Sequence, residues 1–176
     1  MKYFAAAILA GALVTVVAAE HARPNLAGTW KIDTSQAPAT SGGRGGGNGR
    51  GNSRGGGVGL GLAADTLVIT QNYTAVTIEE RYGSVRNVVV LPVDGKKSTN
   101  QVGVGRGAGI PVEFTSRWKD NFLLATFSVP VQGQAPRQYE QTFALGRKDG
   151  GKDNDVLLLQ IKEVGTTNSR TAIYRR

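Results

Sequence analysis

Apolar and polar residues alternate along most of this chain, which is the pattern of strands with one buried and one solvated face. The first example is Asn25–Asp33, where Trp30 and Ile32 fall on one face and Lys31 and Asp33 fall on the other. Similar segments then follow one another with short polar turns between them. The alternation predicts further strands over residues 66–71, 75–82, 85–92, 111–118, 122–131, 138–145, 156–164 and 170–176.

Two segments in the middle of the chain are harder to interpret. Asp94–Gly95 is the strongest hairpin signal in the sequence, and it places Lys96 and Lys97 in a turn. Val102–Gly109 is interrupted by glycines and is compatible with a weak strand or a loop. The count is nine or ten strands with short connections and no amphipathic helix.

Short connections imply antiparallel neighbours, so the chain is predicted to be all-β. Closure of such a meander removes its exposed edges. The first prediction is therefore an up-and-down antiparallel β-barrel of about eight to ten strands. A two-sheet β-sandwich is the alternative.

A glycine-rich segment interrupts the strands after the first one. Residues 41–64 carry Arg44, Arg50 and Arg54 among many glycines, and large apolar side chains are scarce there. Such a segment buries too little surface to offset the entropy of ordering it. We expect a flexible Gly/Arg-rich insertion at 41–64 within a single domain that spans residues 20–176.

The first residues have the features of a cleaved leader. Lys2 precedes the apolar run Ala5–Val17, which has about 13 residues against the ~20 of a membrane-spanning helix. The small residues that follow favour cleavage before Glu20. Residues 1–19 are therefore predicted to be a signal peptide that directs export to the periplasm or beyond, and no later segment is apolar enough to form a transmembrane helix.

Four segments resemble lipocalin-like exported bacterial proteins: residues 26–33, 92–100, 116–123 and 173–176. The resemblance implies a barrel of about eight strands with a Gly-x-Trp first strand. It also implies that Trp30 lies at the closed end and is covered by Arg175 or Arg176, in a structural role. The sequence departs from lipocalins because it shows no helix beside the barrel and has no cysteine for a disulfide.

Residues suited to catalysis are scarce. The one histidine, His21, lies close to the predicted cleavage site, and there is no cysteine. Ser–His relays, thiol chemistry and zinc–thiolate sites are therefore not expected. Glu79 and Glu80 are adjacent on a predicted strand, so their side chains point to opposite faces. We predict a protein that is not an enzyme, with no catalytic residue, no metal site and no cofactor.

Five aromatic residues at strand spacing are candidates to line a pocket inside the barrel or to pack its core: Tyr82, Phe114, Trp118, Tyr139 and Phe143. If they line a pocket, the protein binds a small apolar or amphipathic ligand there. This is the first functional hypothesis.

The alternative hypothesis starts from charge. The chain has 21 Lys and Arg against 13 Asp and Glu, and loss of Lys2 with the leader leaves 20 against 13, or +7. The basic insertion could contact an anionic envelope surface or a protein partner while the barrel is filled. A solvated surface is the simpler explanation of the charge. Nucleic acid is not expected as a partner because the Arg-Gly-Gly segments contain no aromatic residue.

Overall fold

The computed structural model describes residues 23–35, 60–62, 64–102, 109–131, 133–146 and 155–176. The predicted signal peptide at 1–19 lies outside the described residues, as do positions 41–59 and 63 of the predicted insertion.

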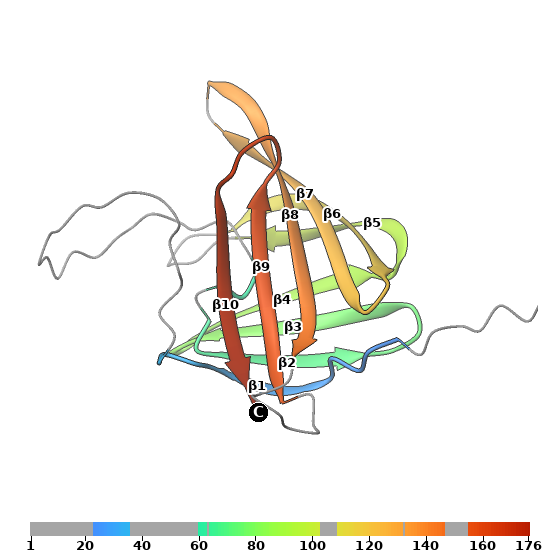
Figure 1. Ribbon diagram of the computed structural model, residues 1–176. Helices are drawn as coiled ribbons and strands as arrows, with labels where there is room; N and C mark the ends of the chain where they lie inside the picture. Colours follow the sequence, from blue (N-terminus) through green and yellow to red (C-terminus); the bar gives the residue numbers. More distant parts are fainter. Residues whose placement is uncertain (1–22, 36–59, 63, 103–108, 132, 147–154) are drawn as a thin grey trace, which may run out of the picture.

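Within the described ranges the chain forms ten strands and no helix (Figure 1). Their bounds are β1 Gly28–Ile32, β2 Thr66–Gln71, β3 Ala75–Tyr82, β4 Val85–Pro92, β5 Asp94–Val102, β6 Ile110–Lys119, β7 Phe122–Val131, β8 Gln134–Gly146, β9 Val156–Glu163 and β10 Ser169–Arg175.

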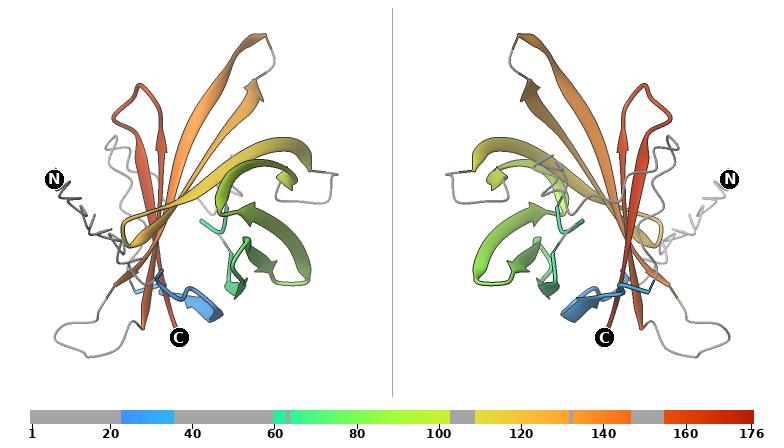
Figure 2. Two further views of the ribbon diagram at one scale, coloured as in Figure 1. Left: turned by 90° about the vertical axis from the view of Figure 1, so that its right-hand side faces the viewer. Right: turned by 90° about the vertical axis from the view of Figure 1, so that its left-hand side faces the viewer.

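All ten strands belong to one antiparallel sheet in the order β4-β3-β2-β1-β10-β9-β8-β7-β6-β5. The first strand therefore pairs with the last, with Lys31 opposite Arg175 and Ile32 opposite Tyr174. The sheet curls until β3 and β4 face β9 and β10 (Figure 2). The predicted all-β, up-and-down barrel is confirmed, with a single nearly closed sheet in place of the two sheets of a sandwich.

Strand alternation builds the core as the sequence pattern predicts. On β7, Leu123, Ala125 and Phe127 are buried, whereas the residues between them are partly exposed. The inward residues of the other strands join them in one contiguous hydrophobic cluster. Burial of this apolar face is the main favourable contribution to folding.

The prediction for the segment after Asp94–Gly95 is wrong. Lys96 and Lys97 lie in β5, not in a turn, and this strand ends at Val102. Gly95 has a φ of +79°, and the register of β5 against β6 shifts between Asp94 and Lys97. Asp94 and Gly95 therefore form a β-bulge at the start of β5. The segment Val102–Gly109, for which the sequence left a weak strand or a loop open, lies largely outside the described residues.

β4 and β5 occupy the two ends of the sheet order, and side chains join them where a backbone ladder would be expected. The Asn100 amide accepts from the Val90 N–H at 2.9 Å and donates to the Val90 carbonyl at 3.0 Å. Ser98 Oγ also donates to that carbonyl, at 2.8 Å, and Ser116 Oγ donates to the Pro92 carbonyl. We call the contact of Ser98 and Asn100 with Val90 the β4–β5 seam; Ser116 of β6 adds its hydrogen bond beside it, and together these side chains bridge the gap left in the nearly closed sheet.

Candidate functional site

Trp30 and Arg176 form the closure at one end of the barrel. Trp30 is fully buried, and its indole N–H donates to the Leu26 carbonyl at 3.0 Å. The guanidinium carbon of Arg176 lies 4.5 Å from the indole ring centroid, which is cation–π geometry. Arg176 also donates to the Ala27 carbonyl at 2.9 Å. Gly28 has a φ of +148°, and a Cβ there would lie 3.3 Å from Arg176 Nε, so the closure needs glycine at this position.

Arg175, the other arginine considered for this role, has a different partner. Its Nε lies 2.6 Å from a carboxylate oxygen of Asp33, which follows β1. Hydrogen bonds from the Ser35 hydroxyl and then from Arg175 lower the pKa of Asp33 to about 2. The two consecutive arginines therefore perform separate tasks: Arg176 covers Trp30, and Arg175 ties β10 to the residues after β1.

The end of the predicted insertion enters the barrel core. We call Leu60, Gly61, Leu62 and Ala64 the strap. Leu60 is 1% exposed, and its backbone N–H and C=O both hydrogen-bond the side-chain amide of Gln141, which is itself fully buried. The hydroxyl of Tyr174 hydrogen-bonds the Gly61 carbonyl and lies 2.7 Å from the Ala64 carbonyl. The described part of the insertion is thus packed, in contrast to the flexibility expected from composition.

The strap requires a glycine at its centre. Gly61 has a φ of +72°, and a Cβ there would lie 3.0 Å from methyl carbons of Leu67 and Leu159. Sequence reasoning missed the strap because glycine dominates the segment before it. A buried-face glutamine at position 141, between Tyr139 and Phe143, was the available signal, since a buried amide needs polar partners.

Glu80 is a buried acid beside the strap. It is 2% exposed, and one carboxylate oxygen accepts hydrogen bonds from Asn87 at 2.9 Å and from the Tyr82 hydroxyl at 3.2 Å. The other oxygen, Oε1, lacks a well-formed hydrogen bond among the described residues, although the Gly61 N–H faces the carboxyl. Burial raises the pKa of Glu80, against the lowering effect of these hydrogen bonds.

The buried environment of Glu80 also changes the pKa values of two nearby tyrosines, Tyr82 and Tyr174. Burial, and then the nearby Glu80 charge, raise the pKa of the Tyr82 and Tyr174 hydroxyls above the ordinary tyrosine value. Both hydroxyls therefore stay protonated and act as hydrogen-bond donors. Their donation to Glu80 and to the strap carbonyls fixes this end of the interior.

The five aromatic residues predicted to line a pocket all belong to the inward set, but they do not form one site. Phe114 and Phe143 are fully buried, whereas Tyr82, Trp118 and Tyr139 are half-buried and pack against the hydrophobic cluster. Tyr82 bonds Glu80 on β3. Trp118 and Phe143 are both cross-strand neighbours of Leu123, which separates them.

Phe114 and Tyr139 are linked by a residue that sequence reasoning did not single out. The Phe127 ring centroid lies 4.6 Å from that of Phe114 and 5.5 Å from that of Tyr139. We call these three the aromatic row; it crosses β6, β7 and β8 on the inward face.

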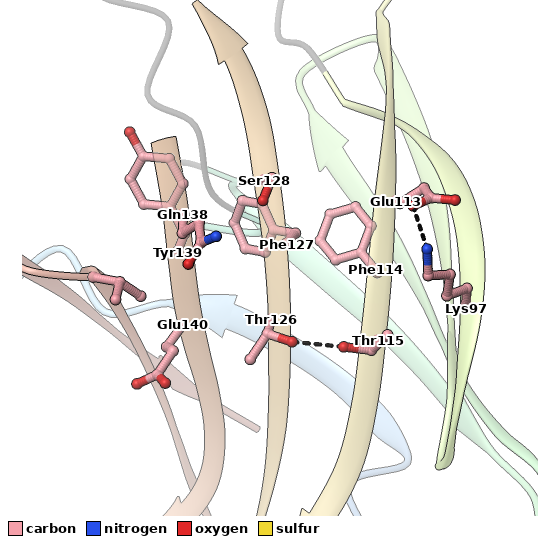
Figure 3. Close-up of a pocket in the computed structure, with 11 residues that line it drawn as sticks. Lys97, Glu113, Phe114, Thr115, Thr126, Phe127, Ser128, Gln138, Tyr139 and Glu140 are labelled. Carbon is pink, nitrogen blue, oxygen red and sulfur yellow. Dashed lines mark hydrogen bonds and ion pairs between the residues drawn. The ribbon is translucent and has the colours of Figure 1, made fainter. Parts of the chain in front are cut away.

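A pocket of about 340 Å³ lies along the same strands, and we call it the outer groove (Figure 3). Most of its lining residues alternate with the buried set and therefore belong to the outer face of the sheet. They are Lys97, Glu113, Thr115, Thr126, Ser128, Gln138 and Glu140. The residues of the aromatic row and Val164 complete the lining.

The outer groove has a polar centre and charged sides. Thr115 Oγ1 and Thr126 Oγ1 lie 2.6 Å apart as cross-strand neighbours, and Lys97 Nζ pairs with Glu113 at 3.0 Å. Figure 3 shows the two threonines between this ion pair on one side and Glu140 on the other. Sequence reasoning missed the groove because a polar outer face looks the same whether it is flat or concave.

The described residues contain no group of three His, Cys, Asp or Glu side chains able to hold a metal ion. In the same part of the chain, no helix has the length and apolar character needed to cross a membrane. No known family model matches the sequence, and a search of curated proteins finds none that is significantly similar.

Proposed function

We propose that this protein is an exported, non-enzymatic barrel that binds its target on its outer surface. The core supports this view more than it supports a ligand inside. Trp30 and Arg176 close one end, and the strap places Leu60 within the contiguous hydrophobic cluster. A ligand in that space would have to displace the strap and break its hydrogen bonds to Gln141 and Tyr174.

The proposed target belongs to the cell envelope. This part of the proposal rests on the leader expected at 1–19 and on the charge of +7 that remains after its loss (20 basic against 13 acidic residues). Positive charge favours association with anionic lipids and wall polymers. Because four segments resemble lipocalin-like proteins, we also propose that the barrel descends from a ligand-binding scaffold and that its interior is now filled.

Sedimentation of the purified protein with isolated cell-wall material tests this function. We expect the protein to pellet with the material, and a deletion of residues 41–58 to weaken only a salt-sensitive part of the binding. A fluorescent fatty acid provides the control, because a filled barrel does not bind it saturably. Absence of the protein from the pellet at low salt contradicts the proposal.

A second candidate function is favoured by Glu80. Its Oε1 lacks a well-formed hydrogen bond, which is costly for a buried polar atom and offers an acceptor to a ligand hydroxyl or amine. The aromatic row supplies an apolar surface elsewhere on the inward face. An amphipathic ligand inside the barrel would place its polar group at Glu80 and its apolar part against the aromatic row. Saturable displacement of the fluorescent fatty acid by long-chain alcohols or amines, lost in Glu80→Gln, supports this function over the first.

A further inference from the structure

The outer groove lies mainly on three neighbouring strands of the sheet. β6, β7 and β8 pair continuously along the groove, with Thr115 opposite Thr126 and Thr126 opposite Glu140. Side chains on paired strands are held more precisely than side chains on loops, so a ligand loses less free energy in ordering them. The volume of about 340 Å³ falls near the lower end of the range for small-molecule sites, roughly 300–1,000 Å³.

The centre of the groove offers both kinds of hydrogen-bonding group. In the Thr115–Thr126 pair one hydroxyl donates to the other, so the accepting hydroxyl keeps its own hydrogen for a ligand. Ser128 adds a hydroxyl, and Gln138 adds an amide that both donates and accepts. This combination suits a ligand whose own groups also both donate and accept, as sugar hydroxyls do.

Charge narrows the class of ligand further. Lys97 is already neutralised by Glu113 at 3.0 Å, and Glu140 is exposed without an ion pair among the described residues. Lys162 on β9 is the cross-strand neighbour of Glu140, so the groove is close to neutral, and among the described residues its lining offers no unpaired cation to attract a phosphate or carboxylate ligand. The lining also contains the aromatic row and Val164, but a wholly apolar ligand is disfavoured because the polar side chains of the groove would lose water without gaining a partner.

We propose that the outer groove binds a short, uncharged oligosaccharide. The Thr115–Thr126 pair contacts its centre, and Gln138 and Glu140 hydrogen-bond hydroxyls on one side. The inference rests on the proposed outer-surface function, to which it adds the site and the class of ligand. Carboxylate side chains such as Glu140 are strong acceptors for hydroxyl groups, and this makes Glu140 the residue expected to select for a polyhydroxylated ligand.

Backbone amide NMR shifts test the site directly. Soluble cello-, malto- and chito-oligosaccharides are titrated into the protein up to about 10 mM, a range that reveals millimolar affinities. We expect at least one series to shift the amides of Thr115, Thr126 and Glu140. The variant Thr126→Val combined with Glu140→Ala should weaken that binding about tenfold or more, as expected from the loss of two or more hydrogen bonds.

Thr142→Val is the matched control. Thr142 lies on the same outer face of β8, two residues from Glu140, but does not line the groove. It should leave the affinity unchanged, and its amide spectrum shows that such a substitution is tolerated.

Three results overturn the inference. The first is that no oligosaccharide shifts the groove amides. The second is that spermidine shifts them and the sugars do not, which would assign the groove to a cationic ligand. The third is that sugars bind equally well to the Thr126→Val, Glu140→Ala protein, which would place the site elsewhere. None of these alters sedimentation with cell-wall material, so the proposed function is judged separately.

Discussion

The last residue of the described chain, Arg176, has a specific role at the barrel end. Its guanidinium lies over Trp30, donates to the Ala27 carbonyl and passes close to Gly28. The sequence limited the choice for this position to Arg175 or Arg176. Alternation along the final strand could not decide between them, because the residue that covers Trp30 lies just beyond the end of β10.

Arg176→Met tests the cation over Trp30, because methionine retains much of the apolar stem and removes the charge. We expect the free energy of unfolding in urea to fall by about 1 kcal/mol through loss of the cation–π contact and one hydrogen bond. Arg170→Met, at an exposed position of β10, is the control and should change it by less than about 0.5 kcal/mol. Equal effects of the two substitutions would contradict a special role for Arg176.

Glu80 should make the free energy of unfolding decrease as pH rises. Its pKa is raised in the folded state, so between the ordinary value of 4.5 and the folded value the folded protein binds more protons than the unfolded chain. Stability from this group is therefore present at low pH and is lost as pH rises through that interval. Glu80→Gln has no ionisable group at this position, so its stability should not fall in this way as pH rises. The stability of the variant minus that of the parent should therefore be larger at neutral pH than at pH 4. Urea unfolding over a pH series measures the difference, and a difference that does not vary with pH would contradict the assignment.

At the scale of elements, β5 explains why part of the fold was missed from sequence. Its inward positions include Ser98 and Asn100, where a barrel strand normally places apolar residues. These two side chains hydrogen-bond the backbone of β4 at the seam, so polarity is required there. An alternation rule looks for apolar residues, so it predicts no strand at Ser98 and Asn100 and leaves Lys96 and Lys97 in the turn that Asp94–Gly95 indicates.

Asn100→Ala tests the β4–β5 seam. It removes the two hydrogen bonds between the Asn100 amide and the part-buried backbone of Val90, although the Val90 carbonyl keeps its hydrogen bond from Ser98. At about 0.5–1.5 kcal/mol for each hydrogen bond, we expect a loss of about 1–3 kcal/mol in the free energy of unfolding. Hydrogen exchange of the Val90 amide should accelerate more than exchange at β7 amides. Thr99→Ala, on the exposed outer face of the same strand, should neither lower the free energy of unfolding nor accelerate exchange of the Val90 amide. Uniform acceleration across all strands would show that the seam has no independent opening.

Tyr174→Phe tests the strap. The substitution keeps the ring and removes the hydroxyl that bonds the carbonyls of Gly61 and Ala64. The Gly61 carbonyl would keep only its long hydrogen bond from the Ala64 N–H, at 3.4 Å, and the Ala64 carbonyl would lose the hydroxyl as a partner. We expect this to cost about 1–3 kcal/mol, measured by urea unfolding. Tyr139→Phe is the matched change within the aromatic row and should cost less than about 0.5 kcal/mol. If the two variants have the same stability, the strap is not held by Tyr174.

At the scale of the whole molecule, the barrel could be predicted from sequence but its binding surface could not. Alternation and short turns specify antiparallel neighbours, and the rule that edges must be covered then favours closure. The strap and the outer groove depend on how strands curve and on which distant segments meet. Leu60 bonds Gln141 across 81 positions of the chain, a pairing for which neither residue carries a local signal.

The pairing of β1 with β10 has a consequence for biosynthesis. A chain that emerges from the ribosome N-terminus first carries β1 without one of its two neighbours until the seven residues of β10 have been made. Until then both β1 and β9 present open edges, and Trp30 lacks its arginine. Closure of the barrel therefore waits for β10, and a nonsense codon within or before β10 would release a chain with open strand edges that is prone to edge-to-edge aggregation.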